Sequence, residues 1–334
     1  MDLDTLDRKI LAQLDLDSRQ SAKEIAKRIG SNKDTVNYRM KRLEADGIIT
    51  GYLARVDTAK FGFANIKTYV KFQDTDEEKE KEFFDYLKKL PEVGWVVQAS
   101  GRWDALFCVW TQSSFSYYDI LMKILNRFSK NIYDKEIIHN MHWFYYNRKW
   151  LLPESHEVKV VRYGGKPVLE KLDDNALAVL EGLAKNGRAK FTEIAEKTGV
   201  SPQNVFHHVK AMNSKGIIAQ YGIDINYEKL GIVFAKAFIR LHNVDEKSLA
   251  SICRFCEREQ RIFALTTTLG AWDLELEMEV ERIEDMMEIM NRIKHSFPDF
   301  IKDYDSIIIT KQPKINYMPA NWWKTTGIPQ ASSR

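Results

Sequence analysis

The sequence has few cysteines, few prolines and no long apolar run. Its 334 residues include 3 Cys and 8 Pro, and no stretch approaches the about 20 apolar residues of a membrane-spanning helix. Three cysteines cannot build a disulfide scaffold, and so few prolines with 29% charged residues exclude a collagen-like or largely disordered chain. The acidic start, MDLDTLDRKI, lacks the basic and apolar parts of a signal peptide, so we expect a cytoplasmic protein without a membrane segment.

An excess of charge of one sign is also lacking. The chain carries 50 Lys+Arg against 47 Asp+Glu, which gives a net charge of +3. This total alone does not predict a nucleic-acid-binding protein, because such proteins usually carry a clear basic excess. The length predicts two or more domains.

Motifs for catalysis, cofactors and metals are missing as well. The sequence contains no Walker phosphate loop, no G-x-G-x-x-G and no legible Ser/His/Asp or Cys/His arrangement. Cys253-x-x-Cys256 has no second cysteine pair, and His139-x-x-His142 has no cluster of further ligands. We therefore expect a protein that is not an enzyme and has no cofactor and no metal site.

What the sequence does contain is an internal repeat with a constant offset of 169 residues. The matches include Leu3-Asp4 with Leu172-Asp173, Ile25-Ala26 with Ile194-Ala195, Gly47-Ile48-Ile49 with Gly216-Ile217-Ile218, and Trp103-Asp104 with Trp272-Asp273. Because the offset never changes over so long a span, the repeat indicates two homologous halves.

The first part of each half, residues 1–60 and 172–229, has the pattern of a winged helix-turn-helix. Apolar residues at helical spacing open the chain, a Ser21-x-x-Glu24 capping box begins a second helix, and Gly30 ends it. A third helix follows. Residues 48–56 then alternate loosely between apolar and polar and predict a short β-hairpin, the wing.

The second part of each half, residues 61–145 and 230–310, changes to the period of β-strands. The order of predicted elements is βαββαβ, so the fold class is α+β, with a ferredoxin-like unit after each winged helix-turn-helix. Helices cover one face of such a sheet and leave the other face open. An open apolar face favours an interface, and we expect a homo-oligomer that forms through these domains.

Residues 146–171 link the halves, and residues 311–334 form a tail. The linker contains Gly164-Gly165 and Pro167, and we expect little regular structure in it. The tail is basic and contains Trp322-Trp323. A linker of this length permits the two ferredoxin-like domains to pair within one chain or with a second chain, and the sequence leaves both open.

The first helix-turn-helix contains a local excess of positive charge that the total hides. Between Arg19 and Arg42 lie eight Lys or Arg and two acidic residues, a local charge of +6. Such cations favour phosphate contacts, while Asn, Arg and Thr can read base edges in a major groove, although a solvated helix face is the ordinary alternative. The predicted DNA contacts in this half are Lys23, Arg28, Asn32, Lys33, Thr35, Asn37, Tyr38, Arg39 and Arg42.

The second helix-turn-helix has a weaker pattern, with a local charge of +2 between Arg188 and Ala211. Its recognition helix begins at Pro202, and two histidines replace Tyr38-Arg39 of the first copy. Gln and Asn can still read adenine, whereas neutral histidines are poorer phosphate ligands. The predicted contacts in this half are Gln203, Asn204, His207, His208 and Lys210.

The first half resembles a complete member of the Lrp/AsnC family of transcription regulators. The motifs that carry the resemblance are Leu3-Asp4 through Ile10-Leu11, Asp17-Ser18-Arg19, Glu24-Ile25-Ala26, Val36-x-x-Arg39, Leu43-Glu44-x-x-Gly47-Ile48-Ile49, Phe61-Gly62 and Ser100-Gly101-x-x-Asp104. The second half matches over residues 172–310, with two departures. Asn186-Gly187-Arg188 stands for Asp-Ser-Arg, and His208 stands for the arginine of the recognition helix.

The resemblance implies a regulator that binds double-stranded DNA and is modulated by an amino acid or related metabolite. It places Gly101, Asp104, Gly270 and Asp273 close to an effector pocket between sheets. Both Gly-x-Trp-Asp motifs are equally well explained as tight hairpin turns. The bulky Trp103 and Trp272 are large enough to fill such a pocket.

Two other functions are compatible with this domain organisation. One is a haem-pathway decarboxylase, which requires a tetrapyrrole pocket with His and Arg in the sheet domain, and residues 92–112 offer Arg102 but no histidine. The other is a metabolite-binding assembly protein with vestigial helix-turn-helix units. The +6 window argues for DNA binding led by the first domain.

Overall fold

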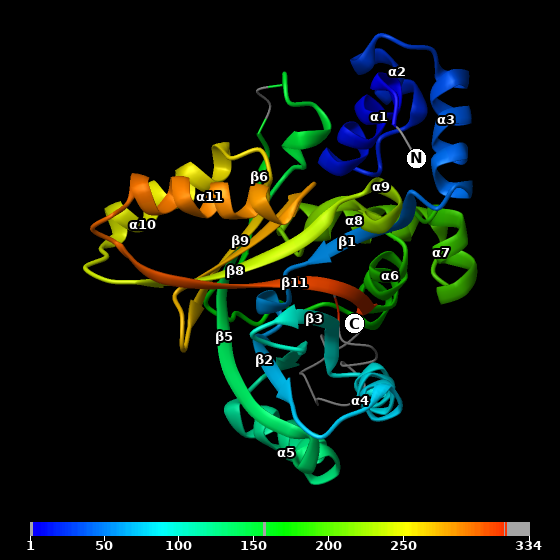
Figure 1. Ribbon diagram of the computed structural model, residues 1–334. Helices are drawn as coiled ribbons and strands as arrows, with labels where there is room; N and C mark the ends of the chain where they lie inside the picture. The colour runs from blue at the N-terminus through cyan, green and yellow to red at the C-terminus, as the bar shows by residue number, and fades with distance from the viewer. Residues whose placement is uncertain (1–2, 156–157, 317, 319–334) are drawn as a thin grey trace.

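The computed structural model describes residues 3–155, 158–316 and 318 (Figure 1). The first half folds as a helix-turn-helix followed by a strand-rich unit. Its elements are α1 (Thr5–Leu16), α2 (Ala22–Ile29), α3 (Lys33–Ala45), β1 (Ile49–Val56), the 3-10 turn η1 (Thr58–Lys60), β2 (Ala64–Phe72), α4 (Glu77–Lys89), β3 (Val93–Gly101), β4 (Ala105–Thr111), α5 (Ser114–Phe128), the 3-10 turn η2 (Ser129–Asn131) and β5 (Ile132–Tyr146).

The second half repeats this order after a connecting segment. The connection contains the 3-10 turn η3 (Lys149–Leu151) and β6 (Val160–Gly164). The second half then consists of α6 (Asp174–Lys185), α7 (Phe191–Thr198), α8 (Pro202–Ser214), β7 (Ile218–Ile225), α9 (Tyr227–Leu230), β8 (Val233–Leu241), α10 (Glu246–Arg258), β9 (Ile262–Leu269), β10 (Leu274–Val280), α11 (Ile283–Ser296) and β11 (Ile301–Ile315).

Capping side chains explain where the first helices of each half begin. The carboxylates of Asp4 and Asp173 each accept a hydrogen bond from the backbone N–H three residues on, at 2.9 and 2.7 Å. The predicted capping box is present, because Ser21 Oγ accepts from the Glu24 N–H and the Ser21 N–H donates to the Glu24 carboxylate. Gly30 ends α2 in the left-handed conformation, with φ of 68°.

The predicted hairpin over residues 48–56 is wrong. This segment is the single strand β1, and its partner is β7 of the second half, antiparallel, with Ala54 opposite Tyr221. The pairing is stable because each strand buries its apolar face among the helices of the other half. Ala54 and Val56 pack in the core of the second helix-turn-helix, and Ile223 packs in the core of the first. We call this two-stranded sheet the ribbon.

The two predicted ferredoxin-like units are present, and their sheets close into one barrel. The first sheet has the order β5–β2–β4–β3 and the second the order β9–β10–β8–β11. Strand β3 pairs with β11 and β5 pairs with β9, so each of these eight strands has a neighbour on both sides. Figure 1 shows α4 and α5 against one side of the barrel and α10 and α11 against another.

The open sheet faces expected from the sequence line the inside of this barrel. The end of the barrel beside the β3–β4 and β9–β10 turns is filled by buried aromatic rings, with the Trp272 ring 4.8 Å from Tyr69 and 4.6 Å from Phe238 between centroids. The two halves therefore pair within one chain. A homo-oligomer through the same domains stays a prediction.

The expectation of little regular structure in residues 146–171 is wrong for part of that segment. Strand β5 is 15 residues long and continues beyond the end of β2, which leaves one of its edges to be paired. Strand β6 fills that edge, with Val161 opposite Tyr145. Likewise, β11 extends to Ile315, so the predicted tail begins as a strand. Trp322-Trp323 lie outside the described residues.

Within the described ranges, no helix combines the length and the apolar character needed to cross a bilayer.

Candidate nucleic-acid interface

Side-chain caps fix the start of both recognition helices, α3 and α8. Asn32 Oδ1 accepts from the Thr35 N–H at 2.8 Å, and Ser201 Oγ accepts from the Asn204 N–H at 3.3 Å. The predicted DNA contact Asn32 therefore also has a structural role. Lys33, which follows it, is exposed at the first position of α3.

The outer surface of α2 and α3 is basic. Its exposed side chains include Lys23, Lys27, Arg28, Lys33, Tyr38 and Lys41, whereas Thr35 and Asn37 are half-buried. Among the residues that the structure describes, no carboxylate lies within ion-pair distance of the four lysines. These cations are therefore available for phosphate oxygens.

Two of the predicted contacts, Arg39 and Arg42, point to α1 instead. Arg39 Nη1 lies 2.5 Å from Asp4 Oδ2 and 3.2 Å from Asp7 Oδ1, and Arg42 Nη2 lies 2.5 Å from Asp7 Oδ2. The Asp7 side chain is only 2% exposed, so the ion pairs lie at the junction of α1 and α3. The hydrogen bonds that Arg39 donates to the Asp4 and Asp7 carboxylates raise the pKa of Arg39. Arg39 and Arg42 thus hold the recognition helix in place.

The second half lacks this ion-pair cluster altogether. The positions of Asp7, Arg39 and Arg42 are occupied by Ala176, His208 and Ala211. Acid and base have been lost together, as expected for residues that contact one another. The counterpart of His208 contacts α1, and the DNA contact predicted for His208 itself stays a prediction.

Arg19, which contributes to the +6 window, lies in the contact between the two helix-turn-helix units. Its Nη1 donates to the carbonyl oxygens of Gly187 and Ala189 at 2.7 and 3.2 Å. Arg188, its equivalent in the second half, donates to the carbonyl oxygens of Ser18 and Gln20. This reciprocal exchange clamps the two units together about a pseudo-two-fold axis.

One departure from the family motif, Asn186 in place of an aspartate, keeps the local hydrogen bond of this contact. Asp17 Oδ1 accepts from the Arg19 N–H at 2.9 Å, and Asn186 Oδ1 accepts from the Arg188 N–H at 3.0 Å. An asparagine oxygen replaces a carboxylate oxygen in the same turn. The clamp arginine is retained in both copies.

The exposed surface of α8 differs in character from that of α3. Gln203, Asn204, His207 and Lys210 are exposed and His208 is half-buried, so four of the five predicted residues lie at the surface. Phe206, which no sequence pattern singled out, is 49% exposed, and its ring centroid lies 5.7 Å from that of His207. An exposed phenylalanine on a recognition helix is suited to contact thymine methyl groups.

Comparison with known proteins identifies both helix-turn-helix units. A family model described as winged helix-turn-helix DNA-binding matches residues 3–50 and 172–219. The proline dehydrogenase transcriptional activator of Rhizobium radiobacter is 36% identical over 121 residues, which are 36% of this chain and 78% of that protein. The regulator LrpA of Pyrococcus horikoshii is 48% identical over 60 residues, 18% of this chain and 43% of that protein.

The chain belongs to the Lrp/AsnC family of transcription regulators. It is a DNA-binding regulator with two helix-turn-helix units. Among solved structures, the siroheme decarboxylase NirDL in co-complex with an iron-uroporphyrin III analogue matches 94% of this chain and 95% of its own, with a TM-score of 0.61 and 13% identity. At that identity the likeness describes the fold of this Lrp/AsnC chain.

The Gly-x-Trp-Asp turns of this Lrp/AsnC chain make local contacts in both halves. Asp104 accepts from the Phe72 N–H and from Lys71 Nζ, each at 2.8 Å, and Asp273 accepts from the Leu241 N–H at 2.7 Å. Each aspartate thereby ties its turn to the end of the neighbouring strand. An effector role for these aspartates stays a prediction.

The glycines of these turns allow the barrel to close. A side chain at Gly101 would begin 3.1 Å from the backbone oxygen of Ser306, and one at Gly270 would begin 2.6 Å from Ile138 Cδ1. Both positions lie where an edge strand of one half meets an edge strand of the other. Trp103 and Trp272 are buried inside the barrel.

The centre of the barrel contains a buried charge cluster that sequence reasoning did not find. Glu275 contacts Lys67 and lies 2.8 Å from Lys236 Nζ, and it accepts hydrogen bonds from the Tyr69 hydroxyl and Trp272 Nε1. Burial alone raises the pKa of this carboxyl, but the two lysines outweigh it and hold the pKa of Glu275 well below its usual range. The cluster is therefore charged and joins strands from both halves.

A second buried cluster joins the first helix-turn-helix to the barrel. Arg148 Nη1 lies 2.6 Å from Asp15 of α1, and Arg148 Nε lies 2.9 Å from Glu279 of β10. Trp150 Nε1 also donates to Glu279, at 2.6 Å. The residues that follow β5 therefore connect the DNA-binding unit to the barrel.

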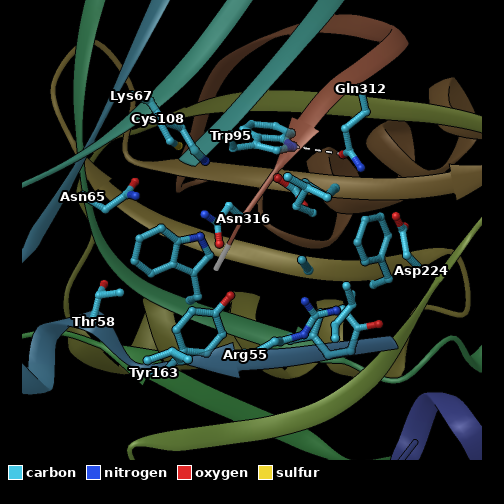
Figure 2. Close-up of a pocket in the computed structure, with 18 of the residues that line it drawn as sticks. Arg55, Thr58, Asn65, Lys67, Trp95, Cys108, Tyr163, Asp224, Gln312 and Asn316 are labelled. Atoms are coloured by element: carbon cyan, nitrogen blue, oxygen red, sulfur yellow. Dashed lines mark hydrogen bonds between the residues drawn. The ribbon is translucent and has the colours of Figure 1, made fainter. Parts of the chain in front are cut away.

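A cavity of about 130 Å³ lies at the end of the barrel that faces the ribbon (Figure 2). Its lining comes from the ribbon, from strands of both sheets and from β6. The described lining residues include Arg55, Asn65, Lys67, Trp95, Cys108, Trp110, Trp143, Arg148, Tyr163, Asp224, Glu277, Gln312 and Asn316. This cavity is separate from the Gly-x-Trp-Asp turns, none of whose residues lines it.

Proposed function

We propose that one chain of this regulator is a complete DNA-binding unit, in which α3 and α8 enter successive major grooves of one duplex. The observation that carries the proposal is the reciprocal clamp of Arg19 and Arg188 across the ribbon. Dimeric helix-turn-helix proteins read two half-sites about 34–36 Å apart with two recognition helices related by symmetry. Here two unequal helices are held together in one chain, which favours an operator with two unequal half-sites.

On α3 we assign base contacts to the side chains near its N-terminus and phosphate contacts to the surrounding cations. Asn can pair with adenine, Thr can touch a thymine methyl group, and mobile lysines neutralise phosphates. The base-contacting residues are Asn32, Thr35, Asn37 and Tyr38, and the phosphate-contacting residues are Lys23, Arg28 and Lys33. Arg39 and Arg42 support binding indirectly, since they fix α3 on α1.

On α8 the proposed base contacts are Gln203 and Asn204, because both amides can pair with adenine. His207 and Lys210 are exposed beside them and are assigned to the DNA backbone. His208 occupies the position of Arg39 and is assigned a supporting role. This half contributes fewer cations, so it adds less to affinity than the first half.

We assign the chain no catalytic activity, in spite of the NirDL-like fold. Sites that bury a drug-sized ligand usually measure about 300–1,000 Å³, and a tetrapyrrole requires a site of at least that size. The cavity below the ribbon measures about 130 Å³, and none of its described lining residues is a histidine. A small-metabolite effector fits this volume better than a tetrapyrrole substrate.

If several copies of this chain assemble, we expect them to contact one another through the outer surfaces of the barrel. The sheet faces and edges of both ferredoxin-like units are occupied within the chain. The exposed apolar side chains that the structure describes on the outer helices include Phe115 and Tyr118 of α5 and Met287 of α11. The proposal therefore places assembly on the helices and not on the sheets.

The test is fluorescence anisotropy with DNA from upstream of the protein's own gene, between about 50 and 200 mM salt. We expect affinity to fall steeply with salt, and Lys33→Ala to reduce the slope of log K against log salt by about one. Lys294→Ala on α11, an exposed lysine away from the helix-turn-helix units, is the control and should leave the slope unchanged. Equal affinity for scrambled DNA at every salt concentration would refute the proposal.

A further inference from the structure

We propose that Phe206 of α8 determines specificity by contacting the methyl group of a thymine in the second half-site of the operator. This inference rests on the proposed function, because it requires α8 to enter a major groove. Among the four bases, thymine alone presents a C5-methyl group in that groove, and an apolar side chain recognises it by contact. The phosphate contacts assigned above supply no discrimination of this kind.

The exposure of Phe206 is the first observation that supports the inference. Its side chain is 49% exposed, whereas Val205, Val209 and Met212 of the same helix pack in the core of the unit. A single exposed apolar residue is common on protein surfaces, so its position decides what it means. This one lies on the recognition helix, where a phenyl ring gains stabilisation by covering an apolar group of the DNA.

The ring of Phe206 is supported by a second ring, that of Phe191 on α7. Their centroids lie 6.1 Å apart with 61° between the ring planes, an edge-to-face contact. The guanidinium of Arg19 lies 4.7 Å from the centroid of the Phe191 ring, so the clamp between the two units also supports this pair. A ring that is already held in place loses little further freedom when it meets a base, which favours a specific contact.

The aromatic pair distinguishes the second half from the first. The first-half equivalents of Phe191 and Phe206 are Ala22 and Asn37, so both rings are missing together. The amide of Asn37 can pair with adenine, whereas a phenyl ring can contact only an apolar group. The two recognition helices should therefore prefer different bases at equivalent positions of the two half-sites.

The neighbouring amide favours an A·T pair at this place. Gln203 is exposed and precedes Phe206 by three residues, a spacing that puts both side chains on one side of the helix. Its amide is assigned to adenine, and the thymine that pairs with adenine presents its methyl group in the same groove. Gln203 and Phe206 can therefore read the two strands of an A·T step together.

The test compares DNA from upstream of the protein's own gene with a copy in which deoxyuridine replaces every thymidine. The two duplexes differ only in the C5-methyl groups. We expect the full chain to bind the thymine duplex more tightly in fluorescence anisotropy. Burial of one methyl group corresponds to roughly fourfold in affinity, so Phe206→Ala should reduce the thymine-to-uracil affinity ratio by about that factor.

The change in this ratio, and not the ratio itself, reports Phe206, because Thr35 of α3 can also contact a thymine methyl group. Phe206→Leu should keep most of the ratio, since leucine preserves an apolar surface. Phe115→Ala on α5 removes an 83% exposed ring away from the helix-turn-helix units and should leave the ratio unchanged. Equal thermal midpoints of the three variants would show that folding is intact.

The possible outcomes separate this inference from the proposed function. If Phe206→Ala kept the wild-type ratio while both duplexes still bound with a steep salt dependence, Phe206 would not contact thymine and the proposed function would stand. If the wild-type chain bound neither duplex in a salt-dependent way, the proposed function would fail, and this inference with it.

Discussion

At the scale of single residues, Asp7 determines which partner the recognition-helix arginines Arg39 and Arg42 contact. It is buried at the junction of α1 and α3, and it contacts both Arg39 and Arg42. Helical periodicity explains the geometry, because both arginines flank the inward stripe of Val36 and Leu43. A basic residue on a recognition helix therefore need not contact DNA.

Asp7→Ala should lower stability more than it lowers DNA affinity. The two arginines keep some exposure and can be solvated, so we expect a loss of about 1–2 kcal/mol in the free energy of unfolding. Urea denaturation measures this loss. Arg39→Ala in the Asp7→Ala background should add little further loss, because the pair is already broken.

The salt dependence of DNA binding separates this role from a direct contact. Asp7→Ala and Arg39→Ala should both keep the wild-type slope of log K against log salt. A slope reduced by about one in Arg39→Ala alone would assign that arginine to a phosphate and contradict the structural role.

At the residue level, the sequence indicated which side chains face outward, but it did not reveal side-chain partners that are distant in the chain. Lys33 and Gln203 are exposed as expected. Arg39 pairs with a carboxylate 32 positions away, and Arg19 donates to a carbonyl group 168 positions away. The repeat held a usable clue, since the acid and both bases of the Asp7 cluster disappear together in the second half.

At the scale of elements, local pattern identified the helices and the βαββαβ order but not the partner of β1. Capping, spacing and glycine ends act within a few residues and are legible in sequence. Strand partners are chosen by long-range burial, and β1 pairs with β7 because each strand covers the other half's core. For the same reason, the pairing of β6 could not be predicted from the sequence. The edge of β5 that pairs with β6 is the part of β5 that β2 leaves unpaired.

Gly187→Ala should disrupt the junction between α6 and the ribbon. A Cβ at Gly187 would begin 2.3 Å from the Leu53 backbone oxygen, which cannot move without shifting β1. We expect a loss of about 1–3 kcal/mol, typical of overpacking, together with weaker DNA binding. Thermal unfolding and anisotropy measure the two effects.

Gly51→Ala is the matched control on the ribbon itself. A Cβ there would begin 3.9 Å from Asp224 Cβ, an ordinary contact, so its unfolding free energy should stay within about 0.5 kcal/mol of wild type. If Gly51→Ala destabilised the chain as much as Gly187→Ala does, the close approach at Gly187 would not be the cause.

At the scale of the whole molecule, buried charge makes the two halves unequal and complementary. The first half contributes Lys67 to the barrel interior, and the second contributes Lys236 with Glu275, Glu277 and Glu279. The first-half equivalents of the three acids are Leu106, Cys108 and Trp110. Two first halves would bury two lysines without acids, whereas two second halves would bury four carboxylates, from Glu275 and Glu279, with two lysines and would add the two half-buried carboxylates of Glu277. Burying unpaired charge is costly, so the pairing within one chain is favoured over symmetric pairing of like halves.

Exchanging one charge across the pseudo-two-fold axis tests this complementarity in the intact chain. Glu275→Leu should cost about 3–5 kcal/mol in urea denaturation, because it leaves two buried lysines short of a carboxylate. Leu106 is the equivalent of Glu275 in the other half, so adding Leu106→Glu should place a carboxylate between the same lysines and recover most of that loss. Because side-chain volumes stay similar, recovery reports charge pairing and not packing. A double variant as unstable as Glu275→Leu alone would mean that position 106 does not reach the cluster, and that the two halves are not related by the symmetry inferred here.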